Sequence, residues 1–216
     1  QTLCDLFSLK KEKGAIEGLS IALCGDLKYG RTIHSLTYAL ARMGATIIFC
    51  PSAGYEIPDY VVKKLTEEYG GELRKVDANE VPTLAGVASG DKAELDALYI
   101  TPSTPHQPAL LTDIGMRVDL KSGVDALYVT RLQNERLSTE EEAGDKSKSY
   151  MVINEKTLRG KEFKESLVMH PLPRVDELAY AVDADPRSIY FKQAARGVPV
   201  RSYPRYSGAN RRRRLT

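Results

Sequence analysis

The sequence predicts an α/β fold: a three-layer, doubly wound, mostly parallel, Rossmann-like sheet with helices on both faces. Three observations lead to this prediction. Apolar segments of strand length alternate with segments of helical periodicity along the chain. The residues from Ser20 to Leu36 form an apolar strand, a glycine-bounded loop and an amphipathic helix in succession. A chain of 216 residues with 42% hydrophobic residues can bury one good core.

The expected elements follow one another along the chain. In chain order they are a helix ending at Lys13, a strand from 20 to 24, a helix from 32 to 43, a strand from 45 to 50, a helix opened by Pro58, strands near 72 to 76, 96 to 101, 125 to 130 and 166 to 170, and a helix from about 186 to 196. Residues 1–200 are expected to form a single domain, and residues 201–216 a basic tail outside it.

Charge and composition exclude several classes of protein. The 31 basic and 29 acidic residues nearly balance, so no general attraction to nucleic acid is expected. No signal peptide or membrane-spanning apolar run is present, and a cytoplasmic protein without a membrane partner is predicted. Cys4, Cys24 and Cys50 lack metal-ligand spacing, so no metal site is expected, and Cys24 and Cys50 should be buried thiols that close strands.

The helix from 32 to 43 should present an anion site at its start. Thr32, Leu36, Leu40 and Met43 recur at helical spacing, and Gly44 suits the position after the last turn. The first turn has free amides and the positive end of the helix dipole, to which Arg31 adds a fork of donors. The segment from Gly25 to Thr32 differs at one residue from a phosphate-binding Walker A loop, because Arg31 stands where the lysine should be, so nucleotide hydrolysis is disfavoured.

Two further strand ends carry arginine. Arg131 and Gln133 follow the strand from 125 to 130 and would share a face if the strand continued. The strand from 166 to 170 ends in His170-Pro171-Leu172-Pro173-Arg174. The two prolines fix the backbone there and remove two amide donors. A convergent anion pocket at these three strand ends is therefore predicted, against the alternative of a proline turn with His170 satisfied in the core.

These segments resemble the aspartate-binding half of the aspartate carbamoyltransferase family. The resemblance rests on the motifs His170-Pro171-Leu172-Pro173-Arg174, Gly25 to Thr32 and Tyr128 to Gln133, with a later block from Asp183 to Ala194. Gln1 looks like the last residue of the family's His-Pro-Thr-Gln segment. The resemblance covers roughly residues 1 to 80 and 118 to 201.

The resemblance implies transfer of a carbamoyl group from carbamoyl phosphate to L-aspartate in pyrimidine biosynthesis, without a cofactor. It also implies an N-terminal carbamoyl-phosphate domain as partner and a homotrimer of catalytic chains. The loop Ser-Thr-Arg-Thr of that domain is absent from this sequence, which has no initiator methionine. A fragment that holds no catalytic residue of its own, and is inactive by itself, is therefore expected.

Roles for single residues also come from the resemblance. Arg31 and Arg131 would hold the two carboxylates of aspartate, with Gln133 assisting and Thr32 beside them. Gln1 would contact the carbamoyl amide, and the carbonyls of Pro171 and Leu172 would accept hydrogen bonds from the reacting nitrogens. Supporting roles are expected for Lys28, Glu135, Arg174 and Asp176.

Two segments depart from the family pattern. Asp96 to Thr101 nearly repeats Asp125 to Thr130, whereas the resemblance implies one such strand, and an insertion near the sheet edge is expected, without a catalytic role for His106. From Arg201 the chain is polar and basic instead of continuing into an apolar helix, so a disordered tail is expected.

Other functions stay open at this point. A module that binds an amino acid or anion without catalysis is one, and a carbamoyltransferase for another amino acid is a second. Ornithine carbamoyltransferase is disfavoured, because its loop reads His-Cys-Leu-Pro and its substrate calls for acidic partners.

Overall fold

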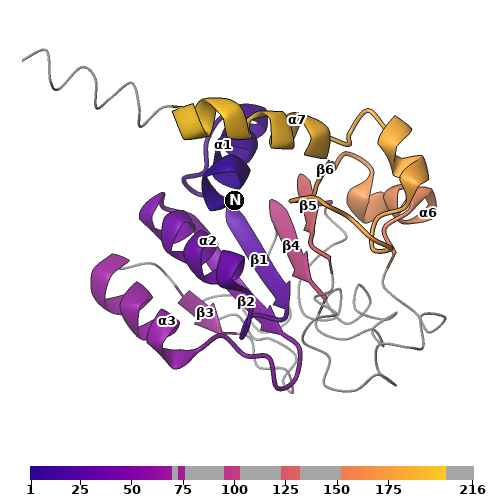
Figure 1. Ribbon diagram of the computed structural model, residues 1–216. Helices are drawn as coiled ribbons and strands as arrows, with labels where there is room; N and C mark the ends of the chain where they lie inside the picture. Colours follow the sequence, from indigo (N-terminus) through magenta and orange to yellow (C-terminus); the bar gives the residue numbers. More distant parts are fainter. Residues whose placement is uncertain (70–72, 76–94, 103–122, 132–151, 203–216) are drawn as a thin grey trace, which may run out of the picture.

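The computed structural model describes residues 1–69, 73–75, 95–102, 123–131 and 152–202. These residues form a parallel sheet with helices packed on both faces (Figure 1). The predicted three-layer α/β fold is therefore confirmed.

Within the described residues the sheet has six strands, in the order β3-β2-β1-β4-β5-β6, and each neighbouring pair is parallel. The strands are β1 Ser20–Gly25, β2 Thr46–Pro51, β3 Leu73–Lys75, β4 Ala97–Thr101, β5 Ala126–Val129 and β6 Leu167–Met169. The chain moves outward from β1 to β3 and then crosses to the other side of β1 at β4. Ligands of doubly wound sheets bind outside the carboxyl ends of the strands at such a reversal.

The position of β4 overturns one expectation. The segment was expected near the sheet edge, but β4 pairs with β1 on one side and with β5 on the other. The two near-identical strands lie in register, and the rings of Tyr99 and Tyr128 stack with their centroids 4.0 Å apart. Because every residue of β4 is buried, the apolar run fits a central parallel strand better than an edge strand.

One face of the sheet is covered by the first helices of the chain. These are α1 (Thr2–Lys13), α2 (Arg31–Arg42) and α3 (Asp59–Lys64), the last continued by a π-helix at Leu65–Tyr69. Leu6, Leu36 and Val61 pack there against Leu23 and Phe49 of the sheet. The alternation of β1 is visible in this packing, since its even-numbered residues Ala22 and Cys24 belong to the core of the opposite face.

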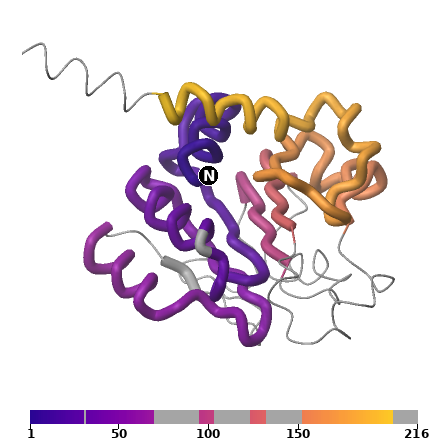
Figure 2. Tube along the Cα trace, in the orientation of Figure 1, coloured from indigo at the N-terminus to yellow at the C-terminus, as the bar shows by residue number. Residues whose placement is uncertain are grey.

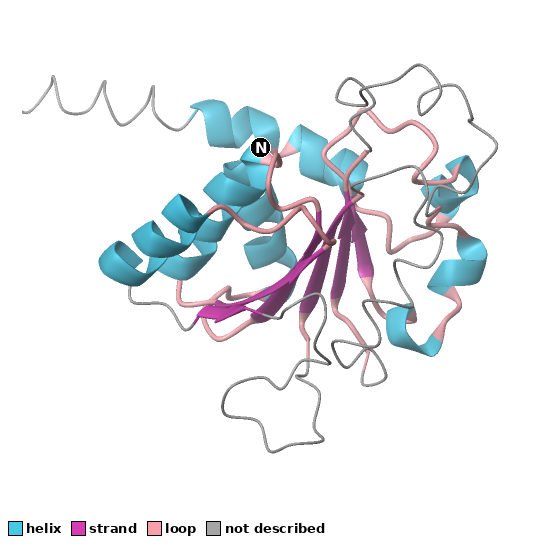
Figure 3. Cartoon of the chain, turned by 90° about the horizontal axis from the view of Figure 1, so that it is seen from below, coloured by secondary structure: helices cyan, strands magenta, loops and turns pink. Residues whose placement is uncertain are grey.

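The opposite face is covered by short elements late in the chain, and Figure 3 shows helices on both sides of the strands. They are α6 (Glu155–Leu158) and the 3-10 helices Lys161–Phe163 and Tyr180–Ala184, together with α7 (Tyr190–Ala195), which places Tyr190 in this core and Gln193 against α1. The sequence patterns predicted α7 but none of the other three. Elements this short carry no helical period, which explains why they were missed.

The two ends of the described chain lie side by side, as Figure 2 shows for the indigo and yellow segments. Gln193 of α7 donates from Nε2 to Asp5 Oδ1 of α1 at 2.7 Å, and Arg196 forms an ion pair with Glu12. α1 and α7 therefore form one packed unit over the edge of the core.

Several boundaries differ from the expected ones. The last helix begins at Tyr190 instead of 186, because the Asp185 side chain accepts the backbone N–H of Arg187 in a turn that precedes the helix. Residues 197–202 are helical as well, so the expected tail loses its first two residues to a helix. The rest of the tail lies outside the described residues. Gly44 has a φ of 76°, as expected for a residue that ends a helix.

Candidate functional site

A cavity of about 120 Å³ lies at the carboxyl ends of the strands on the β4 side of the reversal. Its wall is formed by the start of α2, the ends of β4 and β5, and the loop that follows β6. The residues of the wall are Gly30, Thr32, Ile33, Tyr99, Thr101, Thr130, Arg131, Pro171, Leu172 and Pro173. Arginine is the one charged residue type among them, so the described wall of the cavity is cationic.

The start of α2 faces this cavity without a side-chain cap. Gly30 is the N-cap residue, no described side chain caps the helix, and no acidic residue lies in its first turn. The first helical hydrogen bond runs from His34 N to the Gly30 carbonyl, so the amides before it have no partner inside the helix. An anion at this position would accept those amides and meet the positive end of the helix dipole.

The loop before α2 is held by its own polar contacts. His34 Nε2 donates to the Leu27 carbonyl at 2.9 Å, which leaves Nδ1 to accept from the Tyr60 hydroxyl at 3.1 Å. Asp26 Oδ1 accepts the backbone N–H of Tyr29 at 2.9 Å. The amides of the first turn are therefore presented by a braced loop.

Gly25 allows β1 and β4 to approach closely at the edge of the cavity. Its φ is 93°, and a Cβ placed on it would lie 1.9 Å from the carbonyl oxygen of Thr101. Since no side chain intervenes, Asp26 N donates to that carbonyl at 2.8 Å and fixes the end of β4. Thr101 is thereby held at the floor of the cavity.

Three hydroxyls in the wall of the cavity, those of Tyr99, Thr101 and Thr130, have no hydrogen-bond partner in the described structure. Thr101 Oγ1 and Thr130 Oγ1 are both buried, and neither has a partner in the described structure. Thr101 has only 6% of its surface exposed. Arg131 follows Thr130 directly and is half-buried in the wall. A buried hydroxyl is costly without a partner, so these groups favour a ligand that accepts hydrogen bonds.

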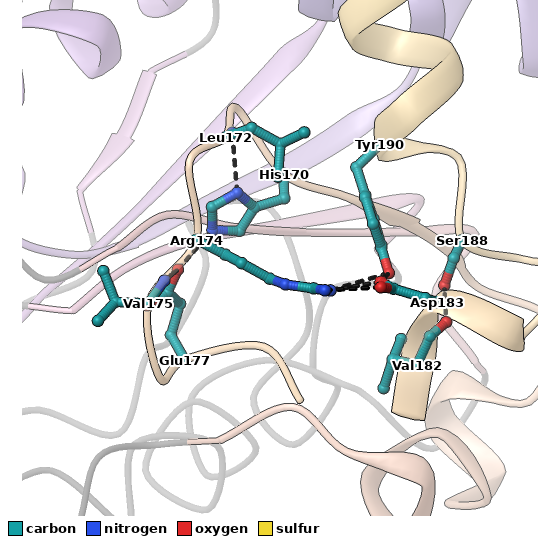
Figure 4. Close-up of polar contacts among 9 residues, drawn as sticks. All are labelled: His170, Leu172, Arg174, Val175, Glu177, Val182, Asp183, Ser188 and Tyr190. Carbon is teal, nitrogen blue, oxygen red and sulfur yellow. Dashed lines mark hydrogen bonds and ion pairs between the residues drawn. The ribbon is translucent and has the colours of Figure 1, made fainter. Parts of the chain in front are cut away.

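The loop after β6 is held by buried hydrogen bonds around His170 (Figure 4). Leu172 N donates to His170 Nδ1 at 2.9 Å, so the ring hydrogen lies on Nε2, which donates to Glu177 Oε1 at 2.7 Å. Leu172 has a φ of 52°, unusual for a residue with a side chain. The hydrogen bond from the Leu172 backbone N–H to the His170 ring therefore fixes the backbone of Pro171 and Leu172 where these residues line the cavity.

Glu177 is ionised in this arrangement. Burial alone would raise the pKa of Glu177, but hydrogen bonds from His170 and from the Val175 amide outweigh burial and hold its pKa below the usual value. A carboxylate that accepts a buried imidazole N–H and a backbone N–H acts as a fixed anchor for the loop.

Arg174 does not line the cavity, and its guanidinium points toward Asp183 in a second cluster (Figure 4). Its guanidinium binds both carboxylate oxygens of Asp183, with Nη2 to Oδ2 at 2.6 Å, and lies 4.2 Å from the ring centroid of Tyr180. The Tyr190 hydroxyl donates to the same carboxylate. Hydrogen bonds from Arg174 hold the pKa of Asp183 below its usual range.

Behind the cavity, Asp5 joins three elements. It accepts hydrogen bonds from Gln1 Nε2 at 2.6 Å, Gln193 Nε2 at 2.7 Å and the Tyr128 hydroxyl at 3.1 Å. Gln193 in turn accepts His170 N at 3.1 Å. Burial raises the pKa of Asp5 to about 6 despite these donors.

The structure brings together four of the residues expected to contact substrate: Thr32, Arg131, Pro171 and Leu172 line the cavity. Arg31 is the first residue of α2, but its side chain lies outside the part of the chain that the structure describes. Gln1 does not line it, and its amide is bonded to Asp5. Gln133 lies outside the described residues.

The supporting residues are placed away from the cavity. Lys28 and Asp176 are exposed, and Lys28 Nζ lies 5.3 Å from the ring centroid of Tyr29. Arg174 pairs with Asp183, as described above. Glu135, like His106, lies outside the described residues.

Sequence reasoning missed Thr101, Asp5, Glu177 and Gln193. Thr101 was missed because its strand was taken for an edge insertion. The other three are polar residues on elements that meet only in the folded chain, but Asp5 and Glu177 each lie within or beside a motif that the sequence shows.

Within the described residues, no group of three or more His, Cys, Asp or Glu side chains is placed to hold a metal ion. No helix in this part of the chain has the length and apolar character needed to cross a membrane.

A sequence model for the aspartate/ornithine carbamoyltransferase Asp/Orn binding domain matches residues 115–202. The chain is 35% identical over 202 residues to the aspartate carbamoyltransferase catalytic subunit of Clostridium botulinum strain Langeland, covering 93% of this chain and 53% of the relative. It is 37% identical over 201 residues to that of Methanothermobacter thermautotrophicus, covering 93% and 51%. The chain thus spans about half the length of these relatives.

Solved structures give the same relationship. The catalytic subunit of M. jannaschii aspartate transcarbamoylase superposes with a TM-score of 0.60 at 32% identity, covering 93% of this chain and 52% of that chain. Aspartate transcarbamoylase from Trypanosoma cruzi in complex with aspartate and phosphate superposes with a TM-score of 0.57 at 28% identity, covering 93% and 50%.

Proposed function

We infer from these matches that the chain belongs to the aspartate/ornithine carbamoyltransferase family, and from this premise we propose that it is the amino-acid-binding part of an aspartate carbamoyltransferase. The reaction is attack of the L-aspartate amine on the carbonyl carbon of carbamoyl phosphate, which gives N-carbamoyl-L-aspartate and releases phosphate. The observation that carries the proposal is the cationic cavity at the sheet reversal, where an uncapped helix start and Arg131 face one small space.

In this proposal the two carboxylates of aspartate are bound from two sides. The free amides at the start of α2, together with Arg31 and Thr32, take one carboxylate, and Arg131 takes the other with help from Gln133. Two forks of donors suit a dicarboxylate, because an arginine side chain binds a carboxylate with two parallel hydrogen bonds.

The Pro171 and Leu172 carbonyls orient the reacting nitrogens. Carbonyl oxygens accept hydrogen bonds from an amine, and the buried contacts of His170 keep this segment in place. Held in this way, the amine is oriented toward the carbamoyl carbon, and orientation alone can supply roughly 7 kcal/mol or more of barrier lowering.

Carbamoyl phosphate would be bound by a part of the protein that corresponds to the other half of the relatives. Gln1 would contact the carbamoyl amide after releasing Asp5. We further propose residues 1–200 as the aspartate domain, with Arg174, Asp176, Lys28 and Glu135 in supporting roles, a basic tail at 201–216, a cytoplasmic location and a trimer of catalytic chains. T. cruzi aspartate transcarbamoylase has been solved with aspartate and with carbamoyl phosphate, which supports these substrates.

A carbamoyltransferase for another amino acid is less well supported. Ornithine carries a second amine, which calls for an acidic side chain, and none of the described residues of the cavity wall is acidic. Pro171, Leu172 and Pro173 also replace the Cys-Leu-Pro expected for an ornithine enzyme.

Calorimetric titration of the purified chain with L-aspartate and with L-ornithine tests the proposal. We expect binding of L-aspartate alone, and we expect Arg131→Ala to weaken it by roughly 2 to 5 kcal/mol, the effect of losing a buried charge partner. Lys192→Ala, at an exposed position of α7 that does not line the cavity, is the matched control and should bind normally.

Preferential binding of L-ornithine, or full affinity in Arg131→Ala, would overturn the proposal. A colorimetric assay for carbamoyl aspartate on the same sample distinguishes a catalyst from a module that only binds, and we expect little turnover from this chain alone.

A further inference from the structure

The cavity contains a pair of donors to which the resemblance assigns no role. Thr101 and Thr130 both line it, and their buried hydroxyls have no hydrogen-bond partner in the described structure. Thr101 lies on β4, outside the 115–202 segment matched by the family.

The register of β4 with β5 places these two threonines opposite each other on neighbouring strands. Tyr99 pairs with Tyr128 and Ile100 with Val129, so Thr101 and Thr130 come next on the two strands. Both belong to the face on which the two tyrosine rings stack, because side chains alternate along a strand. Neighbouring strands lie about 4.8 Å apart, a spacing that one group with two acceptor oxygens can bridge.

The backbone holds both threonines in position independently of any ligand. The Thr101 carbonyl accepts Asp26 N at 2.8 Å beside Gly25, and Thr130 N donates to the Ile100 carbonyl at 3.0 Å. These backbone hydrogen bonds fix the ends of both strands, so the strands cannot shift to bring the two hydroxyls into contact with water. Since a valine would fill the same space without an unpaired polar atom, the two hydroxyls are best explained by a bound acceptor.

We propose that Thr101 and Thr130 donate together to one oxyanion of the ligand, the aspartate carboxylate nearest the sheet, and so help to set ligand specificity. This inference rests on the proposed function. The charge fits as well, because the described wall contains no acidic residue and the start of α2 presents its amides to the same space.

The test is titration of the purified chain with L-aspartate and, separately, with inorganic phosphate, for native protein and for Thr101→Val, Thr130→Val, Thr101→Ser and Thr130→Ser. Each valine variant is expected to lose roughly tenfold or more in affinity, because a hydrogen bond to a charged group is removed. The serine variants keep the hydroxyl and should bind nearly normally.

Thr37→Val is the matched control. Thr37 is fully buried on α2, but its hydroxyl already donates to the Ile33 carbonyl at 2.7 Å, so this variant should keep native affinity. Thermal melting of the ligand-free proteins adds a second readout. Thr101→Val and Thr130→Val should melt no lower than native protein, since they remove hydroxyls that have no partner.

Native affinity for L-aspartate in both valine variants would overturn the inference and leave the proposed function standing. Binding of phosphate alone, weakened in the valine variants, would support the paired hydroxyls while contradicting aspartate as the ligand. Binding of neither ligand would overturn both. A marked drop in the ligand-free melting temperature of the valine variants would show that the hydroxyls are satisfied within the protein.

Discussion

On the β6 side of the cavity the buried polar groups around His170 are bonded to one another, whereas the threonine hydroxyls at the ends of β4 and β5 have no partner among the described residues. His170 uses both ring nitrogens, one toward Leu172 N and one toward Glu177. Across the cavity, Thr101 and Thr130 have no partner in the described structure.

The difference separates scaffold from site. A satisfied network resists movement and specifies one conformation, while unsatisfied buried groups raise the free energy of the empty protein and are stabilised by a ligand that pairs with them. Substitutions on the β6 side should therefore act first on stability, and substitutions on the β4 and β5 side should act first on affinity.

The largest stability effect is expected for Glu177→Ala. It leaves the ring N–H of His170 buried without an acceptor and removes the acceptor of the Val175 N–H, and the free energy of unfolding should fall by roughly 2 to 4 kcal/mol. Urea denaturation at neutral pH measures it. Asp176→Ala, at the exposed neighbouring carboxylate, is the control and should change stability by less than about 0.5 kcal/mol.

The loss should also depend on pH. Because the folded pKa of Glu177 lies below its usual value, its contribution is present above the pKa of the unfolded chain and is lost as the pH falls through the folded pKa. The deficit of Glu177→Ala should therefore shrink in acid. Equal stability of the Glu177 and Asp176 variants would contradict the division into scaffold and site.

Asp5 should show the opposite dependence on pH. Its pKa rises from 3.8 to about 6 on burial, so folding binds a proton between these values and native stability falls as the pH rises through them. Asn at this position cannot ionise. From pH 4 to pH 7, Asp5→Asn should gain up to roughly 3 kcal/mol of unfolding free energy relative to native protein.

Denaturation curves across this pH range measure the relative gain. Asp59→Asn, at an exposed position of α3, controls for the loss of one negative charge. A constant difference between Asp5→Asn and native protein would show that the Asp5 carboxyl is not desolvated. Asp5 links the two sides through Tyr128 and Gln193, so its variant should alter both stability and affinity.

The sequence predicted the sheet and the three motifs of the cavity well, because each lies within one local segment. Strand periodicity located β1, and the glycines around Asp26 to Gly30 located the start of α2. The near repeat at Asp96 was visible too, but pairing order between strands is a property of the whole fold, so its central position was missed.

The hydrogen-bond partners were harder to predict. Asp5 and Gln193 lie 188 positions apart and meet only because α1 packs on α7. Nothing in either local pattern distinguishes a buried aspartate from an exposed one on an amphipathic helix. The partners of His170 were closer in sequence, and Glu177 could have been proposed from its spacing in the loop.

The smallest effect is expected for Arg174→Lys, which tests whether the β6 side is scaffold throughout. Lysine cannot make the paired contacts to both oxygens of Asp183 or stack as a flat group over Tyr180. Because the Asp183 side chain is 34% exposed, the loss should stay near 1 kcal/mol. Arg174 does not line the cavity, so affinity for L-aspartate should be unchanged.

Calorimetry measures the affinity and urea denaturation the stability, both on one preparation. Arg131→Lys is the reciprocal control, which should weaken binding at native stability. Weakened binding in Arg174→Lys would place this arginine in the site and move the boundary between the two sides.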